Sequence, residues 1–427
     1  MTWNRSLLFY KCQPKHFIST YSLLYSHKND VKIMQNFQYN KPVVILGIES
    51  SCDETGCGIV DSTGTILGEG INSQYLTHSN FGGIVPTIAQ IMHKNNITKT
   101  CEDALRNAGL KLKDIDAIAT TVKPGIELSL NIGIKFGKYL AKIGNKPFIP
   151  INHMEAHALT ARMKEKIDFP YLALLISGGH SLLAIVENVN KFYLLGTTID
   201  IAPGEVFDKI ARRLRLRNIP EFRTLNGGSA IEYAASKATD IDQFTFLPIL
   251  TQYRNCNFSF SGLLNKCKMY IASEEEKHKL VADMVIPDVY NLCAALQLAV
   301  ITHICQRTQR AMEFINRKRL FPKGERKLII SGGVACNNLL SKALKIVCSD
   351  VDYKFIRTPP KLCTDNGVMI AWNGVEKWKT DTDIIRDPYE INNIKAEGSA
   401  TFGEDWTQKV ESANIKCQWS KIKRKLY

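Results

Sequence analysis

Two nearly identical pentapeptides, about 150 residues apart, limit what this chain can fold into. Leu175-Ile176-Ser177-Gly178-Gly179 and Ile329-Ile330-Ser331-Gly332-Gly333 each read as an apolar strand that ends in a Ser-Gly-Gly turn. Glycines at such a turn let backbone N–H groups approach an anion, because no Cβ stands in the way. Either copy alone could be an ordinary strand-end turn, but their agreement favours two anion-binding turns in one fold.

Other apolar strand patterns alternate with helical patterns along the chain. Strands are predicted at residues 42–48, 57–60, 65–68, 115–120, 171–176 and 327–330, and helices at 84–108, 128–140, 205–216, 287–316 and from 337. This alternation predicts an α/β fold. At 427 residues the chain is longer than one compact core usually holds, so we expect two lobes.

Residues 1–40 differ in composition from the rest of the chain. They carry five lysines and arginines, several serines and aromatic residues, and a single acidic residue, Asp30. A basic, serine-bearing and acid-poor N-terminus is typical of an organelle transit peptide. A disordered tail without a targeting function has the same composition, and in either case these residues are excluded from the fold.

The whole chain is basic, with a net charge of +14. Positive charge suits a polyanionic partner, because neutralised phosphates release their counterions. Two basic runs are candidate phosphate contacts, namely Arg212 to Arg217 and the C-terminal Lys416 to Lys425. Solvated surface explains both runs equally well.

Cysteine spacing and hydropathy exclude two classes of protein. None of the twelve cysteines belongs to a CxxC pair, which argues against a structural zinc module and against a secreted disulfide framework. No run of about 18 uninterrupted apolar residues occurs, so we expect no membrane span.

The sharpest local motif is Asn152-His153-Met154-Glu155-Ala156-His157. In the helix predicted over residues 153 to about 166, the two histidines lie four residues apart on one face, where both rings can bind one metal ion. Asn152 is placed to cap this helix, and Glu155 can complete a capping box. A zinc peptidase of this helical type has a glutamate directly after its first histidine. Met154 occupies that position, so the peptidase interpretation lacks its base, while a chance surface pair of histidines stays open.

A third metal ligand could come from the polar turn Lys361 to Gly367, which precedes an apolar helix. Asp365 lies in this turn and offers a carboxylate. It could equally be only the N-cap of the helix that follows. Sequence spacing does not decide between these two roles.

Eight motifs, in order along the chain, resemble the tRNA threonylcarbamoyladenosine transferases, a family formerly called O-sialoglycoprotein endopeptidases or glycoproteases. They lie within about residues 43–375, at Leu46–Gly56, Gly82–Pro86, His153–His157, Ser177–His180, Gly204–Lys209, Phe258–Leu263, Gly332–Asn337 and Cys363–Asn366. Lys123-Pro124-Gly125 stands where the family has Gly-Pro-Gly. This form resembles the mitochondrial branch and agrees with the leader.

The resemblance implies a two-lobed α/β fold of the actin/Hsp70/sugar-kinase type, with the nucleotide between the lobes. The expected parts are an N-terminal lobe at 41–168, a second lobe at 169–364, a return to the first lobe at 365–400 and a basic C-terminal tail at 401–427. The implied activity is transfer of threonylcarbamoyl from threonylcarbamoyl-AMP to the exocyclic amine of the adenosine 3′ to the anticodon. The implied substrates are mitochondrial tRNAs that read codons starting with A.

Carried over residue by residue, the resemblance implies one divalent cation (zinc, iron or magnesium) that acts in catalysis and is bound by His153, His157 and Asp365. It implies donor contacts at Leu175, Ile176, Ser177, Gly178, Gly179, Asp208, Gly228, Glu232, Cys336, Asn337 and Thr364. The general base is not named; Glu49 and Asp53 are weak candidates, since hairpin hydrogen bonding explains both equally well. Two departures affect this transfer. The loop at 217–226 is longer than usual, so the assignment of Gly228 could shift by one residue, and Asn257 stands where the family has Asp.

The implied partners are the tRNA anticodon stem-loop, a separate synthase that supplies the donor, and a second copy of the chain in a homodimer. The implied location is the mitochondrial matrix. Three other functions stay open: a metal-dependent endopeptidase, an ATPase or sugar kinase on the same fold, and a tRNA-binding scaffold. The kinase needs no histidine pair, and the scaffold would tolerate loss of His157.

Overall fold

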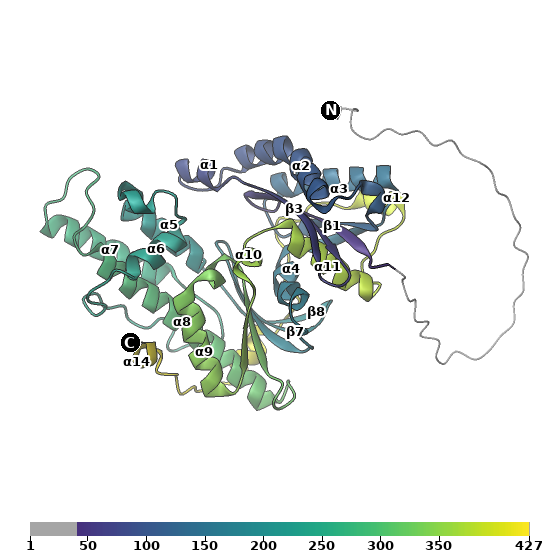
Figure 1. Cartoon of the computed structure of the whole chain (residues 1–427). Helices are drawn as coiled ribbons and strands as arrows, with labels where there is room; N and C mark the ends of the chain where they lie inside the picture. The colour runs from purple at the N-terminus through teal and green to yellow at the C-terminus, as the bar shows by residue number, and fades with distance from the viewer. Residues whose placement is uncertain (1–40, 427) are drawn as a thin grey trace, which may run out of the picture. The chain divides into compact units, whose positions relative to one another are not determined.

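The computed structural model describes residues 41–426, which form one compact unit (Figure 1). The predicted leader at 1–40 lies outside the described residues, as does Tyr427. Two β-sheets covered by helices carry the fold of the described part.

The first sheet has the strand order β3-β2-β1-β4-β5. Its strands are β1 (Val44–Glu49), β2 (Glu54–Asp61), β3 (Ile66–Ser73), β4 (Ala117–Lys123) and β5 (Phe148–Asn152). The strands β1, β2 and β3 pair antiparallel, whereas β4 lies parallel to both β1 and β5. All six residues of β1 are buried, as expected of a central strand that is covered on both faces.

The second sheet has the order β10-β9-β6-β7-β8-β11. Its strands are β6 (Tyr171–Ile176), β7 (Ser181–Asn188), β8 (Lys191–Thr197), β9 (Lys327–Ser331), β10 (Lys354–Arg357) and β11 (Glu404–Asp405). Apart from β11, the order and the strand directions repeat those of the first sheet. The two pentapeptides belong to β6 and β9, which are parallel neighbours with Leu175 opposite Ser331. Both Ser-Gly-Gly turns therefore leave the sheet at the same edge.

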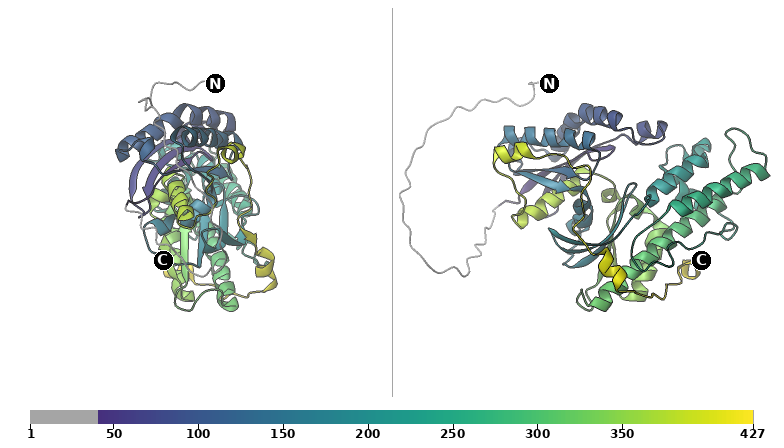
Figure 2. Two further views of the ribbon diagram at one scale, coloured as in Figure 1. Left: turned by 90° about the vertical axis from the view of Figure 1, so that its right-hand side faces the viewer. Right: turned by 180° about the vertical axis from the view of Figure 1, so that it is seen from behind.

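Helices cover both faces of the first sheet. They are α1 (Tyr75–Asn80), α2 (Pro86–Ala108), α3 (Glu127–Gly144), α11 (Gly367–Lys379) and α12 (Pro388–Asn393). Figures 1 and 2 show α2 and α3 on one face of this sheet and α11 on the other. Leu46 and Ile48 on β1 pack with α2 and α3, whereas Ile45 packs with α11, as the alternation of strand side chains requires. A Cβ on Gly47 would lie 2.2 Å from the backbone nitrogen of Ala371, so only glycine lets α11 approach β1 this closely.

The helices of the second sheet enclose the largest hydrophobic core. They are α5 (Pro203–Arg213), α6 (Gly227–Ala235), α7 (Ser261–Lys277), α8 (Val289–Lys318), α9 (Asn338–Val351) and the short α10 (Pro360–Cys363). Among the described helices, α8 alone is long and apolar enough to cross a bilayer, and 78% of its apolar window is buried inside the fold. Its hydrophobicity is therefore that of a central core helix.

The segment that joins the two sheets differs from its prediction. The helix α4 (His153–Leu159) ends before residue 166 and continues as the 3-10 turn η2 (Thr160–Met163). The Thr160 hydroxyl donates to the carbonyl of Ala156 at 2.6 Å, a side-chain bond of the kind that bends helices. The remaining 3-10 turns are η1 (Leu112–Asp114), η3 (Leu216–Asn218), η4 (Pro220–Phe222) and η5 (Gly333–Cys336).

The C-terminal residues are folded onto the second sheet. Strand β11 pairs with β8, and the ring of Trp406 stacks on Tyr193 with centroids 4.0 Å apart. The helices α13 (Thr407–Ser412) and α14 (Ile422–Leu426) follow, and Ile422 is buried in the core. The division into lobes at 168/169 and 364/365 stays a prediction, with which the two separate sheets are consistent.

Candidate active site

The histidine helix begins where the sequence places it. Strand β5 ends at Asn152, whose side chain accepts hydrogen bonds from the backbone N–H groups of Met154 (2.9 Å) and Glu155 (3.4 Å). This confirms the predicted N-cap. Glu155 was expected to complete a capping box, but its carboxylate faces Lys377, with 3.7 Å between the charged atoms.

Two imidazoles and one carboxylate converge within the described residues. The Nε2 atoms of His153 and His157 lie 3.4 and 3.0 Å from Oδ1 of Asp365. The two rings meet edge to face with centroids 4.7 Å apart. One ligand atom from each of the three residues lies within 4.8 Å of the others. Asp365 comes from the turn before α11, so residues more than 200 positions apart in the chain meet here.

These three residues fit a divalent cation. Two ligand atoms that are each about 2.1 Å from one ion lie about 3.0–3.4 Å apart in octahedral or tetrahedral geometry, and the observed N–O distances fall in this range. Asp365 does not cap α11, because Asn366 accepts the hydrogen bond from Met369 N–H at 2.8 Å. The Asp365 carboxylate is therefore available as a ligand.

Electrostatics at this cluster favour positive charge. Burial lowers the pKa of His153, but the carboxylates of Asp365 and Glu49 outweigh burial and raise that pKa well above its ordinary value. Burial raises the pKa of Asp365, but His153 and His157 hold it well below the usual range. The carboxylates of Glu49 and Asp365 thus favour positive charge between them, which a bound metal ion would supply.

Glu49 holds His153 from behind. Its carboxylate is fully buried, with Oε2 3.1 Å from Nδ1 of His153 and 2.6 Å from the hydroxyl of Thr121, which donates to it. Oε1 accepts the backbone N–H of Ser51 at 2.5 Å. A carboxylate that binds the outer nitrogen of a ligand histidine fixes the ring's tautomer and orientation. Sequence reasoning named Glu49 only as a candidate base and missed Thr121.

The first Ser-Gly-Gly turn is a tight connection between β6 and β7. The hydroxyl of Ser177 accepts the backbone N–H groups of Gly179 (3.3 Å) and His180 (3.2 Å). A Cβ on Gly178 or Gly179 would meet no atom within 4 Å, so a ligand can reach this backbone. Leu175 and Ile176 are buried, so their side chains face the core and only their backbone can serve a ligand.

His180 was quoted in a motif but not predicted as a site residue. Burial lowers the pKa of its imidazole, and the positive charges of His153 and His157 add to that effect. The charge of the Asp365 carboxylate opposes this shift and raises the pKa of His180. The Ser-Gly-Gly turn and the metal cluster are therefore electrostatic neighbours.

Asp208 and the glycine pair that begins α6 form the next part of the site. A Cβ on Gly227 would lie 2.1 Å from Oδ1 of Asp208, whereas a Cβ on Gly228 would have only the side-chain oxygen of Asn226 nearby, at 3.6 Å. Burial raises the pKa of Asp208, and the backbone amide of Gly227 counteracts this. Gly227 thus packs directly against Asp208, whereas Gly228 has space beside its Cα that a ligand could occupy.

The remaining predicted donor residues surround the start of α9. Asn337 caps α9 by accepting Leu340 N–H at 2.9 Å, and Glu232 accepts Asn338 N–H at 2.8 Å. A hydrogen bond from the Cys363 thiol, aided by Arg357, lowers the pKa of Cys336 to about 7 despite partial burial. Thr364 is exposed beside Asp365. Asn337 and Glu232 therefore already bind α9, whereas Cys336 and Thr364 are more accessible.

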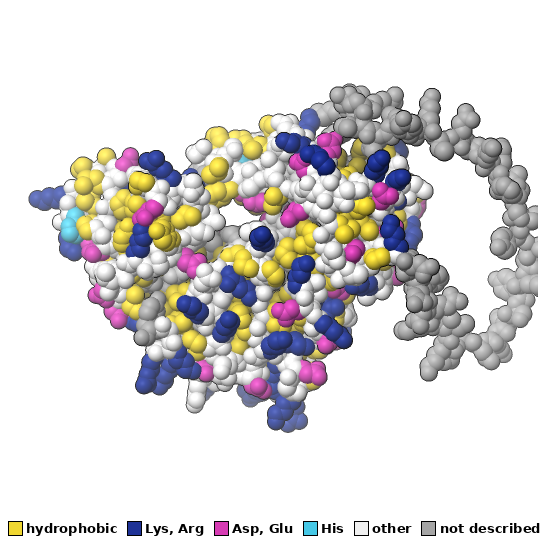
Figure 3. Space-filling model, viewed as in Figure 1, with side chains coloured by type: hydrophobic (Ala, Val, Ile, Leu, Met, Phe, Trp, Pro, Cys, Tyr) yellow, Lys and Arg dark blue, Asp and Glu magenta, His cyan; other side chains and the backbone are white. Residues whose placement is uncertain are grey.

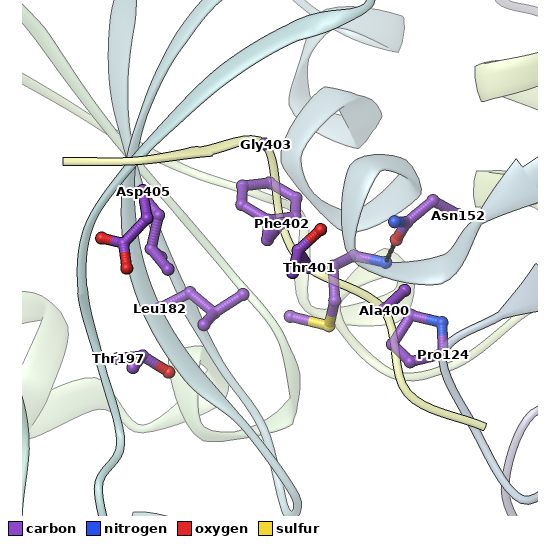
Figure 4. A pocket seen from close by; sticks show the side chains of 11 residues that line it. Pro124, Asn152, Leu182, Thr197, Ala400, Thr401, Phe402, Gly403 and Asp405 are labelled. Carbon is purple, nitrogen blue, oxygen red and sulfur yellow. Dashed lines mark hydrogen bonds between the residues drawn. The ribbon is translucent and has the colours of Figure 1, made fainter. Parts of the chain in front are cut away.

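A cavity of about 330 Å³ opens on another side of the α4 N-terminus (Figure 4). It is lined by Pro124, Asn152, Met154, Leu182, Leu194, Thr197, Ala400, Thr401, Phe402, Gly403 and Asp405. None of the three candidate metal ligands lines it. We therefore place the candidate site at the ligand cluster and the glycine turns.

Comparisons with known proteins agree with this arrangement. The profile of a family described as tRNA N6-adenosine threonylcarbamoyltransferase matches residues 65–372. The chain is 44% identical over 373 residues to the mitochondrial tRNA N6-adenosine threonylcarbamoyltransferase of Rattus norvegicus, which covers 87% of this chain and 89% of the relative. Its counterpart in Danio rerio is 45% identical over 383 residues, covering 90% of this chain and 94% of the relative.

Among solved structures, the chain is similar to HypF of T. kodakarensis. The TM-score is 0.50 at 14% sequence identity, over 80% of this chain and 50% of HypF. This likeness concerns the fold alone. Together with the duplicated sheets, it confirms the predicted α/β fold of the actin/Hsp70/sugar-kinase type.

Proposed function

The chain belongs to the tRNA N6-adenosine threonylcarbamoyltransferase family, and from this premise we propose how its residues divide the reaction. The protein is a mitochondrial enzyme that transfers a threonylcarbamoyl group to the exocyclic amine of an adenosine in tRNA. We further propose that it acts in the matrix and that the adenosine is the one 3′ to the anticodon of tRNAs reading codons that start with A. The donor is threonylcarbamoyl-AMP, supplied by a separate synthase.

The acceptor of the transferred group, the adenine amine, determines what the site must provide. An adenine exocyclic amine is a weak nucleophile, because its lone pair is delocalised into the ring. The donor's carbonyl must therefore be activated, and the AMP leaving group must be held as its bond breaks. The exposed backbone at Gly178 suits phosphate and developing negative charge, and Asp208 suits the ribose hydroxyls.

His153, His157 and Asp365 would hold a divalent cation, which would supply Lewis-acid polarisation to oxygen atoms of the donor. Two imidazoles with one carboxylate favour zinc or iron over magnesium, which prefers oxygen ligands. Glu49 and Thr121 keep Nε2 of His153 directed at the site. The cluster thus combines three metal ligands with a hydrogen-bonded carboxylate, Glu49, that orients one of them.

The two candidate bases differ in burial. The Glu49 carboxylate is fully buried and occupied by Ser51, Thr121 and His153, so it positions His153 and does not meet the amine. Asp53, which follows in the same hairpin, is half-buried. Asp53 is the remaining candidate for accepting the amine proton.

We also propose a homodimer, which exposed apolar side chains of the first sheet and its helices support. Large apolar side chains with 39–64% exposure lie on β3, α1, α2 and the turn between the two helices: Ile71, Leu76, Phe81, Ile84 and Ile91. Such a cluster suits a partner surface more than solvent. A Leu76→Glu variant that sediments as a monomer, while the wild type sediments as a dimer, would support this surface.

The alternative functions have weaker support. A peptidase lacks its glutamate, since Met154 occupies the position directly after His153. A sugar kinase of this fold gives no role to the histidine pair. A tRNA-binding scaffold gives no role to the buried Glu49 behind His153.

The observation that carries the proposal is the meeting of His153, His157 and Asp365 beside the Ser-Gly-Gly turn. The test is mass spectrometry of nucleosides from a tRNA incubated with threonylcarbamoyl-AMP and either wild-type protein or His153→Ala. We expect modified adenosine from the wild type and none from His153→Ala, with normal product from the control His278→Ala at the C-cap of α7. Full activity of His153→Ala would remove the metal cluster from the reaction.

A further inference from the structure

The arginine run at 212–217 is mostly engaged within the protein. Arg213 and Arg215 both pair with Glu275. Arg217 donates to the hydroxyl of Tyr75 at 3.2 Å. Arg212 is the exposed member of the run. The run therefore offers RNA far less free charge than its sequence indicates.

The basic C-terminal residues are also partly neutralised. Lys425 lies 2.7 Å from Asp350, and Lys423 pairs with Asp242. Ile422 anchors this segment in the core. The two basic runs visible in the sequence are thus poor candidates for the main RNA contact.

Free positive charge gathers elsewhere, along the edge strand β10. A groove of about 320 Å³ runs between this strand and α9, which we call the β10 groove. It is lined by Glu165, Ser341, Lys345, Lys354, Phe355, Ile356 and Arg357. Figure 3 shows Lys and Arg side chains concentrated over α9 and the neighbouring strands, in the lower part of the view.

The charged side chains that line the β10 groove are mostly positive. Lys345, Lys354 and Arg357 face a single acidic lining residue, Glu165, which is itself flanked by the exposed Lys164 and Lys166. These cations come from three separate chain segments, so no basic run marks the groove in the sequence. Lys345 lies over the ring of Phe355, 5.8 Å from its centroid, which adds an aromatic surface beside the charges.

The β10 groove ends at the candidate site. Arg357 donates to the carbonyl of Cys336 and to the side chain of Asn338, the latter at 3.1 Å. Strand β10 then continues through α10 directly to Thr364 and Asp365. An RNA strand lying in the groove would therefore lead to the proposed donor and metal residues.

We propose that the β10 groove binds the sugar-phosphate backbone of the tRNA substrate through Lys345 and Lys354 and directs it to the transfer site. The proposal rests on the proposed function, since it requires a tRNA substrate. Backbone contacts of this kind position RNA without reading its sequence. Release of condensed counterions then makes the affinity fall with salt.

The edge position of β10 offers a different explanation for the lysines. Lysine on an edge strand discourages pairing with a strand of another protein. In that role Lys354 would affect association between protein chains and would leave RNA affinity unchanged. The two explanations predict different results for the same variant.

The test compares full-length protein with Lys345→Ala/Lys354→Ala and with the charge-matched control Lys135→Ala/Lys142→Ala on α3. Fluorescence anisotropy measures affinity for an unmodified tRNA that reads a codon starting with A, over a series of KCl concentrations. We expect the groove variant to lose about tenfold or more in affinity and its log–log salt slope to fall by about 1.5, roughly two phosphate contacts. The control should keep the wild-type slope to within about 0.5.

Steady-state kinetics complete the test. The groove variant should show a raised KM for tRNA with an unchanged KM for the donor and an unchanged kcat at saturating tRNA. If the double variant is unstable in thermal unfolding, Lys345→Gln on the exposed face of α9 should lower the slope by about 0.8. An unchanged slope and tRNA KM would overturn the groove while leaving the enzyme's function intact. Absence of any modification by the wild type would instead refute the function.

Discussion

Glu49 Oε2 lies 3.1 Å from His153 Nδ1, on the side of the imidazole opposite to Asp365. Burial alone would raise the pKa of Glu49, but the positive charge of His153 and its hydrogen bond lower it, so the carboxylate is charged. In the neutral imidazole that a metal ion requires, a charged acceptor at Nδ1 keeps the ring N–H on that atom and leaves Nε2, the atom that meets Asp365, as the ligand nitrogen. The orientation of one proposed ligand, His153, is thus set by Glu49, which is not itself a ligand.

We expect Glu49→Gln to weaken metal binding by about 10- to 100-fold, because the neutral amide no longer fixes the tautomer of His153. Transfer should fall in parallel and recover in excess metal. Competition with a chromogenic chelator measures the affinity. Glu155→Gln on the same helix, whose carboxylate faces Lys377, is the matched control. Unchanged metal affinity with lost transfer would make Glu49 a base and contradict the positioning role.

Cys336 should be the most rapidly alkylated of the described cysteines. A hydrogen bond from the Cys363 thiol lowers its pKa to about 7, whereas burial raises the pKa of Cys417 to about 12. The thiolate population of Cys336 grows as pH rises through 7, so iodoacetamide should react about tenfold faster at pH 8 than at pH 6. Peptide mass spectrometry measures this rate. Cys417→Ala, another half-buried cysteine, should not change it.

The donor should protect Cys336 from this reaction, because Cys336 lies beside Asn337 and Arg357 in the proposed donor site. Equal rates with and without threonylcarbamoyl-AMP would exclude Cys336 from the donor contacts. Protection of the buried cysteines alone would indicate a general tightening of the fold.

The strand order is the part of the fold that sequence could least reveal. Continuous apolar runs predicted β6 and β9 almost to the residue, because a strand buried on both faces needs such a run. That β6 and β9 are neighbours is decided by packing between segments about 150 residues apart, which local patterns do not record. The predicted length of α4 was wrong for a similar reason, since the bend at Thr160 depends on a side-chain hydrogen bond.

The site shows the same division between local and distant information. His153 and His157 could be paired from their spacing, because a helix fixes the positions of residues four apart. Asp365 was left between ligand and N-cap, and the structure gives the cap to Asn366. Thr121, Gly227 and the lysines of the β10 groove were missed, because each acts through a contact with a distant segment.

Tyr75 and Arg217 should act together on donor affinity. Tyr75 opens α1, directly after the first sheet, and its hydroxyl accepts a hydrogen bond at 3.2 Å from Arg217 in η3, after α5 of the second sheet. The backbone amide of Gly227, which also supports Asp208, reaches the same hydroxyl. Tyr75→Phe should therefore raise the KM for the donor by about three- to tenfold, the value of one hydrogen bond.

A double-mutant cycle tests this coupling. Tyr75→Phe, Arg217→Leu and the double variant should raise the KM for the donor by similar factors, since each removes the same contact. Tyr389→Phe on α12, where the side chain is 73% exposed, is the control. Additive effects on KM would show that the two residues act independently.

Asp200 should stabilise the fold in a pH-dependent way. Its carboxylate accepts the hydroxyls of Ser259 (2.5 Å) and Ser261 (2.6 Å) and the backbone N–H of Phe260 (2.9 Å). Burial raises the pKa of Asp200, but these donors outweigh it and leave the pKa below its ordinary value. A lowered folded-state pKa gives stability that is present above the unfolded value, about 3.9, and is lost as pH falls through the folded value.

Asp200→Ala should accordingly lower the free energy of unfolding at pH 7 by about 1–2 kcal/mol, a modest amount because water can reach the freed donors. The difference from wild type should shrink below about pH 4, where the wild-type carboxylate begins to be protonated. Urea unfolding at a series of pH values measures both effects. Asp240→Ala removes an exposed carboxylate that accepts one local hydrogen bond, from Asp242 N–H at 2.9 Å, and should cost less than about 0.5 kcal/mol. A difference for Asp200→Ala that persists undiminished at pH 3 would assign the stabilisation to packing, because a protonated carboxyl no longer offers the charge that these donors bind.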